Sequence, residues 1–213
     1  MNQRRMRRRR FLAAAGGTVA VLALSCGGTA VWALRPRATP TSSECRGKNT
    51  MGRVLIAYAT RYGSTTGVAE AIGKALCQAG LEADVRPARE VHDVSGYGAV
   101  IAGAPIYAGT WHGDVKRFVK RNRQALADMP VAYFAVGLGF KDLTEQNRDI
   151  GLKAMRSTAD IVPPMVYGMF AGATNQLPGL FAKTMSENGK NDDLRDWDAI
   201  GAWARGLAPK LVA

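Results

Sequence analysis

The sequence has few of the residues that build metal centres or disulfide frameworks. Its 213 residues include three cysteines, Cys26, Cys45 and Cys77, and their spacing matches no metal-binding pattern. Three cysteines cannot all pair with one another, so we expect no disulfide framework and learn little about the redox compartment. A chain of this length can instead bury a sizeable apolar core in one α/β domain.

Acidic residues are scarce at the amino end. Residues 1–50 contain ten Lys or Arg and a single acid, Glu44. Of the 29 basic and 17 acidic residues in the chain, 19 and 16 therefore lie in residues 51–213, whose formal charge is +3 against +12 for the whole chain. Because the positive charge is concentrated outside the main domain, we expect no nucleic-acid binding.

The basic start is followed by 24 uncharged residues, Phe11–Leu34. A helix of that length can cross a bilayer, which requires about 20 residues. Residues 8–12 also resemble a twin-arginine export motif, and "LALSC" loosely fits a lipoprotein cleavage box ending at Cys26. Translation from Met51 would remove the segment. Four interpretations of this segment remain open: a retained anchor, an export signal, a lipoprotein signal and an overlong reading frame.

The three membrane alternatives share one topology. The arginine cluster should stay in the cytoplasm, which places the rest of the chain across the membrane. After Leu34 the sequence "RPRATPTSSECRGKN" is rich in Pro, Ser and Thr and has no apolar periodicity. We therefore predict a signal or anchor over 1–34, a linker over 35–52 and a domain over 53–213; a start at Met51 would leave the domain in the cytoplasm.

Apolar runs and helical periods alternate along this domain. The predicted strands are Val54–Tyr58, Leu81–Arg86, Ala99–Gly103, Val131–Val136 and Met165–Phe170. The predicted helices are Thr65–Ala79, His112–Ala127, Thr144–Thr158 and Leu194–Leu211, with room for one short helix before the third strand. This alternation indicates βαβ units and a parallel sheet with helices on both faces.

Ligands of such sheets bind beyond the carboxyl ends of the strands, where the strand order reverses. The loop after the first strand, "TRYGST", carries the hydroxyls of Thr60, Ser64 and Thr65 around the open backbone of Gly63. The amides of the next helix point into this loop, with the positive end of the helix dipole behind them. The pattern indicates a phosphate-sized cradle.

Two common phosphate loops are excluded here. A triphosphate loop requires G-x-x-x-x-G-K-[ST], but no Lys precedes Lys74 in this region. A dinucleotide fingerprint requires G-x-G-x-x-G, but only Gly63 and Gly67 are present. A helix cap without a ligand would explain one hydroxyl but not three beside a glycine.

The loop resembles the FMN phosphate loop of flavodoxins. The matching residues are Ile56, Tyr58, Thr60, Gly63, Thr65, Ala69 and Ile72. Ala57 is the one departure. The resemblance extends over residues 53–213 and implies a flavodoxin-like, doubly wound five-stranded parallel sheet in the order 2-1-3-4-5. It also implies that FMN is the cofactor and that its phosphate is held by Thr60, Arg61, Tyr62, Gly63, Ser64 and Thr65.

Two further loops resemble the flavin-ring loops of this family. After the third strand, "APIYAGTWH" implies ring contacts from Pro105, Ile106, Tyr107, Ala108 and Gly109, with Tyr107 or Trp111 as the stacking face. After the fourth strand, Gly137, Leu138 and Gly139 would pass the pyrimidine edge, where backbone amides stabilise negative charge on the reduced ring. We expect no metal and no catalytic side chain, since His112 more simply starts a helix.

Within the superfamily, several stretches resemble the bacterial menaquinone-dependent protoporphyrinogen dehydrogenase group, among them "YGSTTGVAEAIGKAL" and "DWDAIGAWARGLAP". The resemblance implies an enzyme that removes hydrogen from a porphyrinogen through FMN and passes the electrons to a membrane quinone. Together with the N-terminal segment, it leads to our first hypothesis, a membrane-tethered or exported FMN oxidoreductase that exchanges electrons with a quinone or a redox partner protein. The alternatives are dehydrogenation of protoporphyrinogen IX, against which the topology counts, and a binding module that lost FMN. Leu177–Met185 is either membrane-leaning, substrate-covering or a surface helix.

Overall fold

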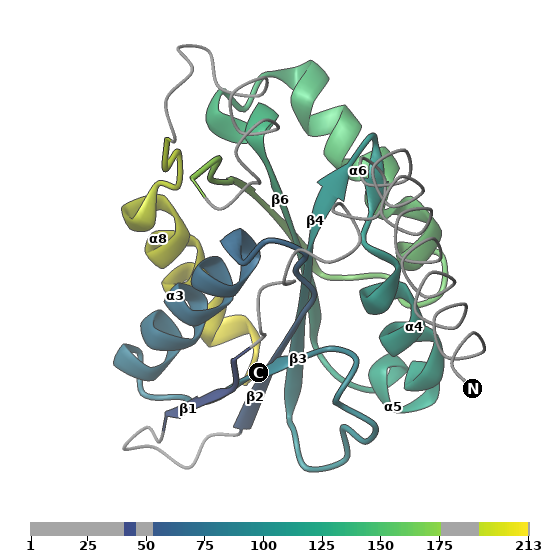
Figure 1. Ribbon diagram of the computed structural model, residues 1–213. Helices are drawn as coiled ribbons and strands as arrows, with labels where there is room; N and C mark the ends of the chain where they lie inside the picture. Colours follow the sequence, from purple (N-terminus) through teal and green to yellow (C-terminus); the bar gives the residue numbers. More distant parts are fainter. Residues whose placement is uncertain (1–40, 46–52, 176–191, 213) are drawn as a thin grey trace, which may run out of the picture. The chain divides into compact units, whose positions relative to one another are not determined.

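The computed structural model describes residues 41–45, 53–175 and 192–212 (Figure 1). The predicted signal or anchor over 1–34 lies outside these residues, as do most of the predicted linker and the apolar stretch Leu177–Met185. Within the described ranges, no helix is both long enough and apolar enough to cross a bilayer.

Five parallel strands form the centre of the domain. They are β2 (Arg53–Tyr58), β3 (Glu82–Pro87), β4 (Ala99–Tyr107), β6 (Val131–Gly137) and β7 (Val166–Ala171). Their order is β3-β2-β4-β6-β7, which confirms the predicted order 2-1-3-4-5. Residues 54–58 and 131–136 are almost wholly buried, as expected for near-continuous apolar strands covered on both faces.

Helices cover both faces of the sheet (Figure 1). On one face lie α3 (Ser64–Gln78) and α8 (Trp197–Leu207); on the other lie α4 (Gly113–Arg121), α5 (Arg123–Ala127) and α6 (Glu145–Ala159). Alternate residues of β2 belong to separate cores: Ile56 packs on the α3 side, while Leu55 packs on the opposite side. The predicted helix 112–127 is divided at Asn122, whose side chain donates a hydrogen bond to the Phe118 carbonyl.

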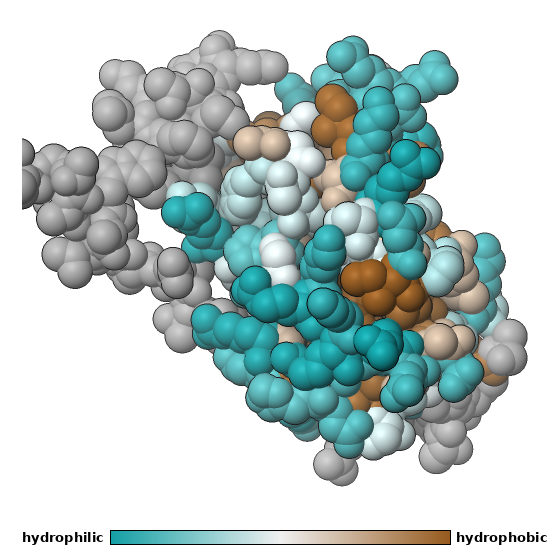
Figure 2. Space-filling model, turned by 90° about the vertical axis from the view of Figure 1, so that its right-hand side faces the viewer, coloured by the Kyte–Doolittle hydropathy of each residue, from teal (hydrophilic) through white to brown (hydrophobic). Residues whose placement is uncertain are grey.

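The face that carries α4, α5 and α6 is largely hydrophilic. Figure 2 shows hydrophilic residues over most of it, interrupted by separate hydrophobic patches. The exposed apolar side chains of α6 include Ile150 and Leu152. Scattered residues of this kind are normal on a water-facing surface.

Two short strands were not predicted. Thr110–Trp111 (β5) turns back antiparallel on the end of β4. Ser43–Cys45 (β1) pairs antiparallel with β3, inside the segment expected to be a linker. The short helix allowed before the third predicted strand is absent, because Ala88–Gly98 forms turns.

A disulfide joins Cys45 to Cys77. Their Cα atoms lie 6.2 Å apart, within the range that disulfides require. The expectation concerned a disulfide framework only, and this single bond was not predicted. Sequence reasoning missed it because the three residues of β1 show no strand pattern, so nothing placed Cys45 beside the end of α3.

Candidate functional site

The amino terminus of α3 is open to an anion. Gly63 occupies the N-cap position with φ 98°, no side chain caps the helix, and no acidic residue lies in its first turn. The other described helices of nine or more residues, α4, α6 and α8, all have a side-chain cap and an acidic residue in the first turn. Only α3 among them leaves its positive end uncompensated by its own sequence.

The hydroxyls of this first loop have different partners. The Gly63 amide donates to Thr60 Oγ1 at 2.9 Å, which closes the turn before the helix. Ser64 Oγ accepts from the Ala173 amide at 3.0 Å and so ties the loop to the end of β7. Thr65 is 1% exposed and lies in the first turn of α3.

Arg195 supports the loop from behind. Its Nη1 donates to the Ser64 carbonyl at 3.3 Å, and its Nε and Nη2 donate to the two carboxylate oxygens of Asp193. The guanidinium also stacks over Trp197, 4.4 Å from the ring centroid. Hydrogen bonds from Arg195 lower the pKa of Asp193 below its ordinary value. A Cβ at Gly67 would lie 2.6 Å from Arg195 Nη1, so this glycine makes room for the guanidinium.

The second loop is a tight hairpin between β4 and β5. Ala108 and Gly109 have φ angles of 47° and 73°, so two successive residues adopt the left-handed conformation, as in two-residue type I′ hairpins. A non-glycine residue such as Ala108 rarely adopts this conformation. No atom of the described residues would lie within 4 Å of a Cβ at Gly109, so among them the space beside this turn is open.

Tyr62 and Tyr107 bring the first and second loops together. Their rings are edge to face, with centroids 6.0 Å apart, and Arg61 lies over the Tyr62 ring. Burial raises the pKa of Tyr107 to about 12. Two aromatic rings from separate loops thus meet at the carboxyl edge of the sheet.

Trp111 is not available as a flavin-stacking face. It is 4% exposed, its Nε1 donates to the Ala104 carbonyl at 3.0 Å, and its ring packs on Tyr133. The hairpin folds Trp111 back into the core, which a sequence reading of an aromatic in a loop does not reveal. His112 is the N-cap of α4 and accepts from the Asp114 amide, as the simpler interpretation of this residue predicted.

The third loop lies beside the first. The Gly172 amide donates to the Gly137 carbonyl at 3.2 Å, and the next amide, of Ala173, bonds Ser64. Leu138 and Gly139 begin a short 3-10 helix, Leu138–Lys141 (η1). Pro105 and Ile106 form the end of β4, where Pro105 is paired with Val136.

The predicted site residues therefore gather at one edge of the sheet, on three neighbouring loops. Sequence reasoning missed Gly172, Ala173 and Arg195, which connect these loops. The small residues after the fifth predicted strand, "AGAT", were an available signal for the first two. Arg195 gave no local signal, since its partner Ser64 is 131 residues away.

Curated relatives match part of the chain. Protoporphyrinogen IX dehydrogenase [quinone] from Escherichia coli strain K12 is 32% identical over 88 residues, which are 40% of this chain and 49% of the relative. The protein of the same name from E. coli O157:H7 matches equally. The chain thus spans about half the length of the curated relatives it matches.

Solved structures share the fold. A cysteine-to-serine mutant of the flavodoxin from Pseudomonas aeruginosa has a TM-score of 0.51 and 16% identity, over 76% of this chain and 99% of that one. An oxidoreductase from Corynebacterium diphtheriae has a TM-score of 0.50 and 18% identity, over 80% of this chain and 98% of that one. The sequence model of the flavodoxin domain matches residues 55–192, well over half of the chain. The chain belongs to the flavodoxin domain family.

Proposed function

We propose that this protein is an FMN-dependent oxidoreductase that exchanges electrons with a membrane quinone. The observation that carries the cofactor assignment is the amino terminus of α3, which has neither a side-chain cap nor an acidic first turn. Such a terminus favours a phosphate monoester, because its free amides and the helix dipole both attract negative charge. FMN, when bound, supplies the electron-transfer chemistry through its ring.

The residues present fit such a group. The first-turn amides of α3 and the hydroxyl of the buried Thr65 would hold the phosphate, and Thr60 closes the turn beside it. Tyr62 and Tyr107 offer aromatic faces for the ring, while the Ala108–Gly109 turn leaves open space beside the backbone. Backbone amides of the third loop, Gly137–Gly139, would stabilise negative charge on the reduced ring.

The quinone assignment rests on the amino-terminal sequence and on the disulfide. The uncharged run Phe11–Leu34 has the length of a membrane span, and a quinone is dissolved in the bilayer. Disulfides persist mainly in oxidising compartments, so the Cys45–Cys77 bond supports an extracytoplasmic domain. The basic residues that precede Phe11 favour the same location for the domain, because such residues stay on the cytoplasmic side of a membrane span.

The second candidate is dehydrogenation of protoporphyrinogen IX. The 32% identity to enzymes of that name favours it. The Cys45–Cys77 disulfide counts against it, because haem precursors are made in the cytoplasm. A third possibility, a binding module without FMN, is disfavoured by the amino terminus of α3. Without a ligand, we would expect this terminus to have a side-chain cap, as α4, α6 and α8 do.

The test is purification of the full-length chain in detergent, followed by flavin analysis and anaerobic electron transfer. We expect a yellow protein whose flavin is readily reduced by a menaquinol analogue. Protoporphyrinogen IX should reduce it only slowly or not at all. Faster reduction by protoporphyrinogen IX would establish the second candidate instead. Combined Thr60→Ala and Thr65→Ala changes should weaken FMN retention, and unchanged retention would show that the phosphate binds elsewhere.

A further inference from the structure

Thr41 joins the two elements that flank the candidate phosphate loop. Its amide donates to Tyr58 Oη at 3.0 Å, and Tyr58 Oη donates to the Thr41 carbonyl at 2.7 Å. Tyr58 is the last residue of β2, the strand that leads into the loop. The Thr41 hydroxyl donates to Glu70 Oε1 at 3.0 Å, in the second turn of α3, the helix that follows the loop. Thr41 therefore braces the loop from both of its ends.

The contact with Thr41 satisfies a buried phenol. Tyr58 is 1% exposed, and its hydroxyl both donates to and accepts from the backbone of Thr41. A buried hydroxyl that loses its partners is costly to leave unsatisfied, so the side chain must move toward new partners or water. Because Tyr58 directly precedes the loop, such a movement reaches residues 60–65.

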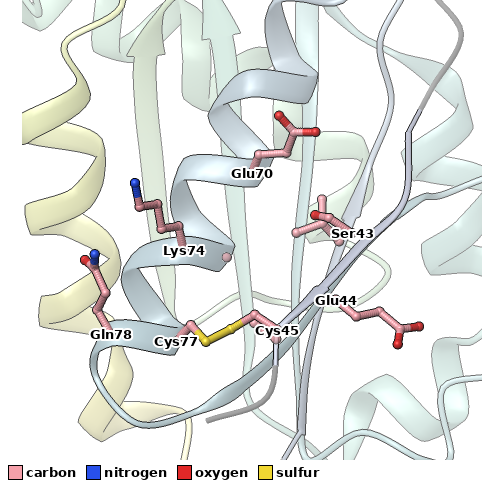
Figure 3. A pocket seen from close by; sticks show the side chains of 10 residues that line it. Ser43, Glu44, Cys45, Glu70, Lys74, Cys77 and Gln78 are labelled. Atoms are coloured by element: carbon pink, nitrogen blue, oxygen red, sulfur yellow. A yellow bond between two sulfur atoms is a disulfide. The ribbon is translucent and has the colours of Figure 1, made fainter.

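Strand β1 keeps Thr41 in this position. The strand is three residues long and pairs with β3 at the edge of the sheet, so it makes few backbone hydrogen bonds. Its ion pair between Glu44 and Arg86 joins two half-exposed side chains and contributes little. Figure 3 shows the Cys45–Cys77 disulfide between β1 and the last turn of α3. The disulfide is therefore the main restraint on β1 and, through β1, on Thr41.

The disulfide is accessible to a thiol reagent. Among the described residues, both cysteines are half-buried and line a pocket of about 440 Å³ between β1 and α3 (Figure 3). The exposed Lys74 lines the same pocket, three residues before Cys77 on α3. Its positive charge attracts a thiolate, the form in which a thiol attacks a disulfide. Exposed disulfides are the ones that exchange readily.

We propose that the Cys45–Cys77 disulfide is a thiol-exchange site for a dithiol, and that its redox state controls the candidate phosphate loop. A thiolate of the dithiol attacks Cys77 Sγ, which forms a mixed disulfide and expels the Cys45 thiolate. The second thiol then attacks the dithiol's own sulfur, which closes the oxidised dithiol and releases the Cys77 thiolate. Both cysteines take up a proton, so two electrons and two protons pass from the dithiol to the protein.

Reduction separates β1 from α3 and removes the brace from the loop. Thr41 then leaves Tyr58 and Glu70, and the residues that receive the anion are no longer held in one arrangement. Binding to the reduced protein must also order the loop, which lowers the affinity. The assignment of the bound group as FMN rests on the proposed function. The release of β1 rests on Thr41, Tyr58 and the disulfide alone.

The test compares the oxidised full-length protein with the same protein treated with dithiothreitol. Alkylation of the freed thiols and mass spectrometry show whether the disulfide has opened. Hydrogen–deuterium exchange at short labelling times should become faster over residues 41–45, 59–66 and 82–87, and stay unchanged in β6 and β7. In a titration with FMN, the Kd of the reduced protein should be about fivefold higher.

Three variants serve as controls. Tyr58→Phe keeps the disulfide but removes the hydroxyl that binds Thr41, so its Kd should already be raised, and reduction should raise it further by less than about twofold. The Cys45→Ser and Cys77→Ser double variant should resemble the reduced protein and ignore dithiothreitol; should it fold poorly, the treated unaltered protein carries the test. Cys26→Ser keeps the disulfide and should respond to dithiothreitol as the unaltered protein does.

Four results would overturn the proposal: a disulfide that dithiothreitol does not open in the folded protein, unchanged exchange over residues 59–66 after opening, an equal loss of protection in β6 and β7, or an unchanged Kd in a protein that binds FMN. An equal loss everywhere would mean that the disulfide only stabilises the domain as a whole. A protein that shows the expected exchange pattern but binds no FMN in either state would support the redox control of the loop and refute the proposed function.

Discussion

The ring of Tyr62 lies edge-on to the ring of Tyr107, with centroids 6.0 Å apart. One residue comes from the loop after β2 and the other from the end of β4, so this contact is where the predicted phosphate loop and ring loop meet. A flat isoalloxazine ring bound at this edge has an aromatic face available from each loop. The contact therefore gives direct tests of the proposed cofactor site.

Truncation of Tyr107 should weaken FMN binding. Loss of one stacking face costs about 1–1.5 kcal/mol, so Tyr107→Ala should raise the Kd for FMN about tenfold in a fluorescence-quenching titration. Tyr167→Ala is the matched control, because Tyr167 is an exposed tyrosine on β7, outside the three loops. Equal Kd values for the two variants would contradict the placement of the ring beside Tyr107.

The ionisation of Tyr107 should be delayed in the folded protein. Burial raises its pKa to about 12 from an ordinary 10.0. The unfolded chain then loses this proton at lower pH than the folded protein, so the free energy of unfolding should fall as the pH rises from about 10 to about 12. In an ultraviolet titration, the Tyr107→Phe variant should lack one phenol that ionises near pH 12 in the unaltered protein. In denaturant unfolding, its free energy of unfolding should fall less between pH 10 and pH 12 than that of the unaltered protein. A phenol missing near pH 10 instead would contradict the buried position.

A carboxylate in the first turn of α3 should affect stability and binding in opposite directions. Thr66, whose amide bonds the Gly63 carbonyl, is half-buried there. Thr66→Asp should raise the free energy of unfolding of the flavin-free protein by about 0.3–1 kcal/mol, since it compensates the helix dipole. It should also weaken FMN binding about tenfold or more through repulsion of the phosphate.

Thr66→Asn supplies the control, with a similar shape and no charge. Denaturant unfolding gives the first quantity and FMN titration gives the second. If Asp and Asn variants bind FMN equally well, the phosphate does not sit at this helix terminus.

Removal of the disulfide should destabilise the domain strongly. The two cysteines are separated by 32 residues, and a cross-link of that span contributes about 3–4 kcal/mol. The Cys45→Ser and Cys77→Ser double variant should therefore melt about 10 °C lower than the unaltered protein in calorimetry. Cys26→Ser should leave the melting temperature unchanged. If the double variant lost less than about 1 kcal/mol in its free energy of unfolding, the other contacts of β1 would be sufficient to hold the strand in place.

The central sheet could be predicted because its strands are long apolar runs buried on both faces, as in Val131–Val136. The candidate phosphate loop could be singled out because Thr60, Gly63 and Thr65 are close together in sequence. Strand β1 could not be predicted, since Ser43, Glu44 and Cys45 carry no apolar pattern and their partners, on β3 and at the end of α3, lie far away in the sequence.

Contacts between segments that are distant in the sequence could not be predicted either. Arg195 reaches Ser64 only because the chain after residue 191 returns beside β7. Trp111 was one of two candidates for the stacking face, and the sequence could not decide between it and Tyr107. The φ angles of Ala108 and Gly109 reverse the chain there and bury the indole.

The most direct test is the flavin content of the full-length protein. The purified chain should carry FMN, or take it up from solution in a one-to-one ratio, with the visible absorption of an oxidised flavin and with FMN as the compound released on denaturation. A well-folded, colourless protein that remains flavin-free after titration with FMN would contradict the account.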